Sequence, residues 1–371
     1  MHMKKIILLS LLAFVVLSGK SQYLMKSGDF IQGGVGDGVK LINAYILPMN
    51  RAMMTGINNT AYTRINYFDD NKHFNLSVRT SFVSIPKADQ TFNVNDLNLQ
   101  KVHPEDPNKV ISQTVFGDSL SHITLVSNQT TYDTTQNPFP MPPTIKKTPL
   151  FKINTLAGSG YQIMPIPYFN AGYRIKYTNF SLGFIPWITI PKSDVRVVLY
   201  SLSLQQNLAW FIKGLQDKPL SIHVLGGYYH FYAHTNLDVQ PQDVAYTMSF
   251  TNHAKGPYDN QEVKITYNSL FVSSIVSYTI KNFTFFGLAG YNFGNSHVQV
   301  LGNYPVYVTN KSGTGSMTLE DITDPMDETD TYDRVKFAAG FQFDFLKMFY
   351  LQANYTMANY GGFGAIVGFR F

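Results

Sequence analysis

The last stretch of the chain, residues 348–371, alternates apolar side chains with small or polar ones at a period of two. In residues 363–371 every second side chain is apolar, and the opposite face is small or polar with Ile366 as the exception. Successive side chains of a β-strand point to opposite faces, so the pattern predicts strands here and in the preceding segment, 349–357. Alternation alone fits a soluble sandwich as well as a membrane barrel, so the rest of the chain must decide.

The amino terminus predicts export. Lys4 and Lys5 precede an apolar run over residues 6–17, and small residues follow at 18–21, as in a signal peptide cleaved before Gln22. No other stretch approaches the roughly 18 consecutive apolar residues that a transmembrane helix needs. The chain has no cysteine, which excludes disulfides, thiolate chemistry and a lipid-bearing cysteine. Any association with a membrane must therefore rest on strands.

Composition favours a barrel and argues against nucleic acid as a partner. The 24 Tyr, 28 Phe and 2 Trp residues are an excess of aromatic side chains, which favour strands and the interfacial girdles of outer-membrane barrels. The net charge is +5, and it falls to about +2 once the three lysines of the signal peptide are removed. No basic block interleaved with aromatic residues remains, so we expect no nucleic-acid binding.

Residues 22–57 differ from the rest of the mature chain and are interpreted as a plug. A glycine-rich entry at 33–38 precedes apolar residues at helical spacing over 39–47, which predicts a helix of under three turns. We expect Asp37 to cap this helix and Pro48 to end it. So short a helix must pack on something, and a barrel lumen or mouth is the preferred place. The residues assigned to the plug are Asp29, Asp37, Tyr45 and Pro48.

The region from 58 to 371 is interpreted as an antiparallel β-barrel in the outer membrane of a Gram-negative cell. Strands follow one another from residue 61, and short links alternate with long ones, as they do between periplasmic turns and outer loops. The short links are 178–179, 281–282 and 345–347, and the long outer loops are 86–165, 235–262 and 295–333. Eleven strands can be counted, and an even number is usual, so we predict 12 to 14.

Cations predominate on the predicted inner face of the barrel. The predicted lumenal residues are Arg79, Arg174, Lys176, Arg196, Arg334, Lys336 and Arg370. One interpretation is structural, with these side chains paired to plug carboxylates such as Asp29 and Asp37. The other is functional, with a lumen that attracts anions, including the carboxylate of an amphipathic substrate.

Motifs for catalysis and metal binding are weak. Residues 115–121 resemble the nucleophile block of GDSL-type esterases around Ser119, but the downstream blocks of that family do not follow it. His230 and His234 share a strand face, and residues 320–333 are acidic without the spacing of a calcium loop. We therefore expect no enzyme, no cofactor and no metal site.

The glycine-rich entry with Pro48, the stretch 160–167 and the terminal residues 368–371 resemble an uncharacterised outer-membrane barrel family of Bacteroidetes-type bacteria, loosely similar to FadL-like fatty-acid transporters. The resemblance implies passive uptake of a small hydrophobic or amphipathic molecule, with the lipid bilayer, lipopolysaccharide and the barrel-assembly machinery as partners. The alternative is a scaffold that acts through its outer loops. The residues that the assembly machinery would read are Phe363, Val367, Phe369 and Phe371.

Overall fold

The computed structural model describes most of the chain after residue 30. The described residues are 31, 34–64, 73–128, 130–135, 144–149, 151–190, 194–208, 211–215, 218–241, 250–309, 317–345 and 348–371. The predicted signal peptide and Asp29 lie outside these residues. No helix within this part of the chain is long and apolar enough to cross a membrane.

Ten antiparallel strands form a closed barrel in which each strand pairs with its neighbours in chain order and β20 closes on β1. The strands are β1 (Phe74–Ser84), β9 (Ile163–Ile175), β10 (Thr178–Thr189), β11 (Arg196–Asn207), β12 (Leu220–Asn236), β14 (Glu262–Ile280), β15 (Phe283–Leu301), β18 (Met326–Phe345), β19 (Phe349–Met357) and β20 (Gly361–Arg370). Alternation over residues 349–371 is confirmed as the last hairpin of this barrel.

The predicted antiparallel barrel is confirmed, but it has ten strands rather than 12 to 14. Two features explain the difference. Residues 61–64, which we expected to begin the first strand, lie inside the barrel instead of in its wall. The short strands of the long excursions pair with one another in separate small sheets, so they add nothing to the barrel.

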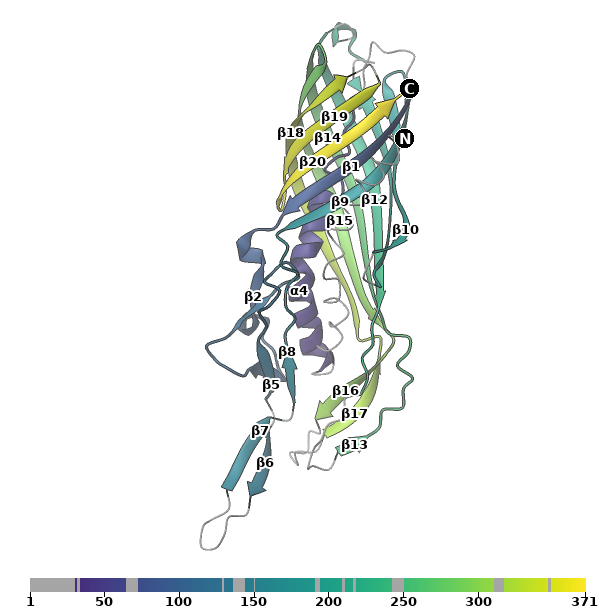
Figure 1. Cartoon of the computed structure of the whole chain (residues 1–371). Coiled ribbons are helices and arrows are strands. Elements are labelled where there is room, and N and C mark those ends of the chain that lie inside the picture. The colour runs from purple at the N-terminus through teal and green to yellow at the C-terminus, as the bar shows by residue number, and fades with distance from the viewer. Residues whose placement is uncertain are drawn as a thin grey trace, which may run out of the picture.

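The links predicted to be tight and the connections predicted to be long lie at opposite ends of the barrel. The tight links after β9, β14 and β18 lie at the end that also holds the carboxy terminus, called the turn end here. The long connections lie at the other end, the loop end (Figure 1). The third predicted loop, 295–333, is much shorter than expected, because β15 continues to Leu301 and β18 begins at Met326.

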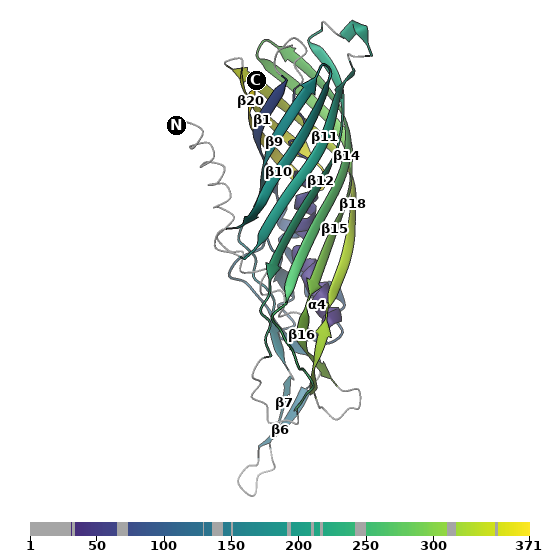
Figure 2. The ribbon, with the colours of Figure 1, turned by 90° about the vertical axis from the view of Figure 1, so that its right-hand side faces the viewer.

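The barrel is lopsided at its loop end. Strands β12, β14, β15 and β18 have 17 to 20 residues, whereas the other six have 9 to 13. The long strands therefore continue past the rim as a one-sided wall, which Figure 2 shows from its broad side. Beyond this wall lies a three-stranded sheet of β13 (Phe250–Asn252), β17 (Met317–Thr323) and β16 (Asn303–Thr309).

Opposite this wall lies the outer excursion, residues 85–162 between β1 and β9. It contains the sheets β2–β4, β3–β5–β8 and β6–β7. Its elements are η2 (Lys87–Asp89), β2 (Thr91–Asn93), η3 (Val94–Leu97), β3 (Val102–Pro104), β4 (Ile111–Gln113), β5 (Thr124–Ser127), β6 (Thr130–Thr135), β7 (Thr144–Pro149) and β8 (Lys152–Asn154). A further short helix, η5 (Lys213–Leu215), lies between β11 and β12. The β6–β7 hairpin reaches farthest from the barrel (Figure 1).

Helix α4 (Val35–Gly56) lies between the excursion and the wall and enters the barrel (Figure 1). It has 22 residues, so it is about 33 Å long and not the short helix expected. Pro48 lies inside it rather than at its end. Packing compensates for the lost backbone donor, because Leu41, Tyr45 and Met53 are buried among the surrounding elements.

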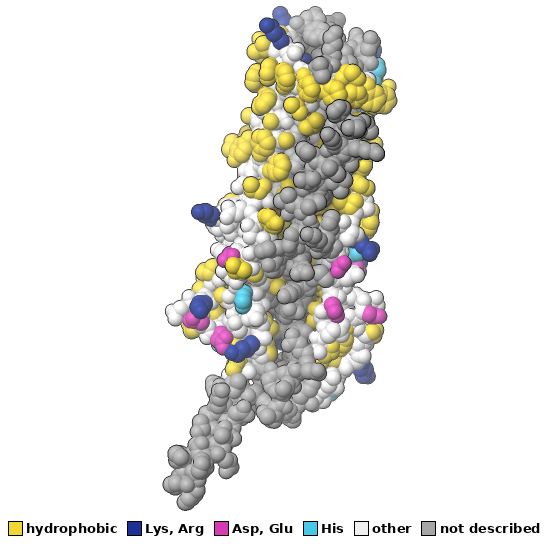
Figure 3. Space-filling model, in the orientation of Figure 1, with side chains coloured by type: hydrophobic (Ala, Val, Ile, Leu, Met, Phe, Trp, Pro, Cys, Tyr) yellow, Lys and Arg dark blue, Asp and Glu magenta, His cyan; other side chains and the backbone are white. Residues whose placement is uncertain are grey.

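The outer surface of the barrel carries an apolar band. Exposed aromatic and aliphatic side chains cover the upper half of the molecule in Figure 3, whereas charged side chains gather over the lower part and at the very top. On β14 the outward residues from Leu270 to Ile280 are mostly apolar, and those from Lys264 to Asn268 are polar. The band thus has a defined edge near the point where the long strands leave the rim.

Candidate functional site

Residues 57–64 continue from α4 and fill the barrel lumen. The Asn58 side chain donates to Asn292 Oδ1 at 3.1 Å, and Asn59 donates to Ser81 Oγ at 2.9 Å. Asn59 also accepts from Asn354 at 2.7 Å. Each of these partners lies on an inward face of the barrel, so polar side chains tie the segment to strands on several sides. We call residues 57–64 the plug segment.

Two buried cations hold the backbone of the plug segment. Arg79 is fully buried and donates to the carbonyls of Thr60 and Ala61 and to the Thr63 hydroxyl. Lys336 is 1% exposed, and its Nζ donates to Asn58 Oδ1 at 2.8 Å and to Asn58 O at 3.2 Å. A charged donor makes a strong hydrogen bond to a carbonyl oxygen. Because the carbonyl carries no net charge, however, the positive charge of the buried side chain is not neutralised.

A third predicted cation, Arg370, lies near the turn end. Its guanidinium bonds to Asp344 at 3.0 Å and lies 4.4 Å from the centre of the Tyr350 ring. The other carboxylate oxygen of Asp344 pairs with Arg64, the last described residue of the plug segment. One inward carboxylate therefore joins the plug segment to the last strand of the barrel.

For two of the other four predicted lumenal cations, Lys176 and Arg196, the predicted position is wrong. Arg174 has inward parity at the end of β9 and is half-buried. Lys176 lies in the β9–β10 turn with a φ of 51° and is exposed, so it does not face the lumen. Arg196 faces outward, because its neighbours Val195 and Val197 take the inward positions. Nearer the turn end the inward residues of β11 are polar (Ser201, Ser203 and Gln205), but at the loop end they are apolar, so a charge there does not mark the inward face.

The predicted pairing of lumenal cations with the plug carboxylates is wrong for Asp37. This side chain does not cap α4, which begins after Gly34 without a side-chain cap. Its carboxylate accepts the backbone N–H groups of Gln100 at 2.9 Å and Lys101 at 2.7 Å. Tyr45 also contacts the excursion, donating to Ala157 O at 3.1 Å. These plug residues thus fasten α4 to the outer excursion and not to the lumen.

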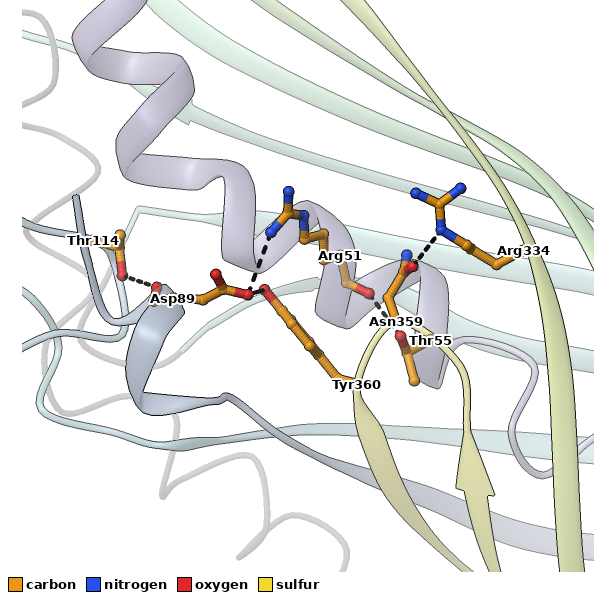
Figure 4. A network of polar contacts seen from close by, with 7 residues as sticks. All are labelled: Arg51, Thr55, Asp89, Thr114, Arg334, Asn359 and Tyr360. Atoms are coloured by element: carbon orange, nitrogen blue, oxygen red, sulfur yellow. Dashed lines mark hydrogen bonds and ion pairs between the residues drawn. The ribbon is translucent and has the colours of Figure 1, made fainter. Parts of the chain in front are cut away.

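A polar cluster at the rim joins α4 to two other parts of the molecule (Figure 4). Asp89 of the excursion accepts from Arg51 of α4 at 3.3 Å and from the Tyr360 hydroxyl at 2.6 Å. Burial, and then the hydrogen bond to Asp89, raise the pKa of Tyr360 above its ordinary value, so the hydroxyl remains a donor. Beside it, Arg334 lies exposed at the rim and donates to Asn359 at 2.8 Å.

Two further hydrogen bonds drawn in Figure 4 support the residues of this cluster. The Thr114 hydroxyl donates to the backbone carbonyl of Asp89 at 2.9 Å, and the Thr55 hydroxyl donates to the carbonyl of Arg51 at the same distance. The first holds the loop that carries the carboxylate, and the second lies within α4 itself (Figure 4). The rim cluster therefore links the excursion, the helix and the β19–β20 turn.

An apolar cavity of about 220 Å³ lies beside α4 at the loop end. Met49 and Met53 of the helix line one side. The remaining walls come from residues 163–167 of β9, the loop-end parts of β10, β11, β12 and β14, and Val115, Phe116, Ser159 and Tyr161 of the excursion. Carbon atoms dominate this lining, because only Ser159 and the two tyrosines bring a polar side-chain atom. Such a space suits a hydrophobic molecule.

The catalytic and metal motifs do not assemble into a site in the part of the chain that is described. Asp118 of the GDSL-like block accepts from Leu120 N at 3.1 Å and from the Ser121 hydroxyl at 2.7 Å, which makes a local turn. Among the described residues no group of three His, Asp or Glu side chains could hold a metal ion. His230 instead bonds to Asn268 at 2.8 Å on the outer face.

The predicted assembly residues all lie on the outer face of β20 or directly after it. Phe363 and Val367 are exposed. The Phe369 ring lies 5.4 Å from that of Phe371, which in turn stacks on Phe74 at 5.7 Å. Two backbone hydrogen bonds join Phe371 to Phe74, so the last residue closes the seam between β20 and β1.

Sequence reasoning missed two parts of this site. The plug segment was assigned to the barrel, although the polar run Asn58, Asn59 and Thr60 after an apolar helix was a usable signal. The cavity was not foreseen at all, because its lining comes from segments far apart in the chain. The one indication of the cavity in the sequence was the pair Pro165 and Pro167, since proline is unusual inside a barrel strand.

Comparisons with solved structures return outer-membrane proteins at low similarity. Ail of Yersinia pestis, in complex with the heparin analogue sucrose octasulfate, is 10% identical, covering 81% of this chain and 99% of its own, with a TM-score of 0.26. The outer membrane protease OmpT of Escherichia coli is 8% identical, with coverages of 83% and 96% and a TM-score of 0.29. The translocator domain of autotransporter NalP from Neisseria meningitidis is 9% identical, with coverages of 88% and 96% and a TM-score of 0.27.

No curated protein matches the sequence. Residues 3–371 match a family described as "Family of unknown function (DUF6588)".

Proposed function

Because the chain belongs to the DUF6588 family, whose function is unknown, we propose a function from the barrel itself. The protein spans the outer membrane of a Gram-negative cell with its loop end outside. It holds a small hydrophobic molecule in the apolar cavity at that outer mouth. The observation that carries this proposal is the cavity, which has an apolar lining and lies between the helix and the barrel wall.

The outer surface supports the membrane position. Residues 270–280 of β14 span about 34 Å along the strand at 3.4 Å per residue, which is a height of about 26 Å at the tilt usual for such barrels. That height matches the apolar band of outer-membrane barrels, about 25 Å. Beyond this band the long strands carry Asn268, Asn295 and Asp333 outward, as expected for a surface in water.

The filled lumen argues against an open pore. Arg79, Lys336 and Asn354 all bond to the plug segment across the interior. Passage through the lumen, as in FadL-like uptake, would require this segment to leave its hydrogen bonds. A hydrophobic molecule in the cavity meets no such barrier, because the cavity lies at the loop end beside Met49 and Met53.

A cavity-filling substitution tests the proposal. Ala233 of β12 lines the cavity, and Ala233→Trp should occupy that space. We expect the hydrophobic fluorophore phenylnaphthylamine to bind the purified protein and the variant to bind it at least about tenfold more weakly, a loss of about 1.4 kcal/mol. The matched control is Ala339→Trp, on the exposed outer face of β18, which should bind like the original protein.

Two results would contradict the proposal: no saturable binding by the original protein, or equal loss in both variants. The first result would favour the alternative function, a scaffold acting through its outer parts. One observation favours that alternative. The β6–β7 hairpin, paired from Thr130 to Pro149, projects far beyond the rim, where it does nothing to close the mouth (Figure 1).

A further inference from the structure

The barrel wall is split at its loop end between β9 and β10. Their ladder runs from the tight turn to the pair Phe169 and Phe184 and ends there. Beyond this point β9 remains paired with β1 as far as Ile163. Meanwhile β10 remains paired with β11 as far as Thr189. About six residues of β9 and five of β10 thus lie beyond their shared ladder, roughly 17 to 20 Å of strand edge at 3.4 Å per residue.

The sequence explains why the strands part here. Pro165 and Pro167 of β9 lack the N–H that a ladder needs, and so does Pro186 of β10. The register of β10 against β11 also shifts between Ile185 and Ile188, where two residues oppose one. A bulge of this kind bends its strand and ends regular pairing. The split is therefore built into both strands.

The cavity lies along this split. Five consecutive residues of β9, 163–167, line it. Because successive side chains of a strand point to opposite faces, a cavity confined to the lumen would meet only every second one. Contact with all five therefore indicates a cavity that extends along the free edge of β9. Ile185 of β10 and Val197 of β11 line it from the other side of the split.

The sides of the split continue the apolar band of the barrel exterior. Ile163 on β9 is 53% exposed, and Trp187 on β10 is 55% exposed. Phe184, at the end of the ladder, is exposed as well. Exposed apolar residues thus border the split on both strands, and Met53 and Ile265 line the cavity next to it.

We propose that the split between β9 and β10 is a lateral port through which an acyl chain of a lipid in the outer leaflet enters the cavity. This inference rests on the proposed function, because it needs an apolar ligand in the cavity. It adds the class of that ligand and its route, which runs sideways from the bilayer and leaves the plug segment in place.

A photoactivatable phospholipid tests the port in the original protein. The protein is reconstituted in vesicles that contain a phospholipid with a diazirine at the end of one acyl chain, illuminated, and mapped by mass spectrometry. We expect labels on Met53 and Ile265, both buried and turned away from the bilayer, together with labels on outward residues such as Leu182 and Phe337. Labels confined to outward residues would overturn the proposal.

A crosslink across the split separates the lateral route from the outer mouth. The chain contains no cysteine, so Pro167→Cys with Pro186→Cys provides a single pair, one on each side. A short bismaleimide should join them and abolish the labels on Met53 and Ile265. The matched control joins Ala171→Cys to Leu182→Cys, which already face each other in the ladder, and it should leave those labels unchanged.

The possible outcomes distinguish a failure of the port from a failure of the proposed function. Interior labels that persist after the crosslink between residues 167 and 186 would show entry by the outer mouth and remove the port. Binding of phenylnaphthylamine without any interior lipid label would remove the port and keep the proposed function. Interior labels lost only in the crosslinked port variant would support both.

Discussion

Three hydrogen bonds from the Arg79 guanidinium reach the plug segment, at Thr60 O, Ala61 O and the Thr63 hydroxyl. Hydrogen bonds to charged groups contribute about 1.5 to 3 kcal/mol each. We therefore expect Arg79→Met to speed amide hydrogen exchange over residues 60–64 at least about tenfold, which corresponds to about 1.4 kcal/mol of local opening. Mass spectrometry of the folded barrel measures it.

Arg334→Met is the control for that substitution. Arg334 shares the inward parity of Lys336, but it is exposed at the rim, where its side chain bonds to Asn359 and to the Asp333 carbonyl. Exposed polar contacts contribute little, so exchange in the plug segment should stay near that of the original protein. Equal acceleration in both variants would mean that Arg79 is not a specific anchor.

At the same scale, the sequence predicted residue directions only where polarity alternates. Arg79 stands between outward Val78 and Thr80, and Lys336 stands between outward apolar neighbours; both face inward as predicted. Arg196 stands between two valines, and its direction was predicted wrongly. No pattern within a strand could show that the partners of these cations would be backbone carbonyls, because those carbonyls belong to a segment that pairs with no strand.

At the scale of the element, β20 is the strand on which closure depends. Phe371 and Phe363 are almost equally exposed, at 47% and 48%, but only Phe371 lies at the terminal seam against Phe74. We expect Phe371→Ala to lower the outer-membrane level several-fold more than Phe363→Ala. Heat-modifiable migration of the extracted barrel measures the folded fraction. Similar levels for the two variants would show that only lipid-facing area matters.

Helix α4 shows why element lengths were harder to predict than element types. A proline usually ends a helix, so the sequence predicted an end at Pro48. Tertiary packing reversed this outcome, since residues on both sides of Pro48, such as Tyr45 and Met53, are buried. The strands β15 and β18 exceeded their predicted lengths for a related reason. The protruding parts of β14, β15 and β18 pair with one another, so polar outward residues such as His297 and Asp327 remain in the ladder.

At the scale of the whole molecule, the long strands, the outer excursion and α4 all lie at one end of the barrel. An eight-stranded barrel is just filled by its own side chains, so ten strands leave additional room that the plug segment occupies. The sequence indicated a plug before a barrel, but it could not show how deep the plug reaches. That depth depends on contacts such as Arg64 with Asp344, which join residues 280 positions apart.

Removing α4 together with the plug segment should therefore open a narrow, anion-selective pore. In a variant without residues 22–64, the inward cations Arg79, Lys336 and Arg370 would face Asp344 without the plug carbonyls. Fixed charges lining a narrow pore attract the opposite ion, so the reversal potential in a potassium chloride gradient should show anion preference. The full chain should not conduct. Adding Arg79→Gln and Lys336→Gln to the deletion should abolish the preference, and a cation-selective deletion variant would contradict the assignment of these side chains to the lumen.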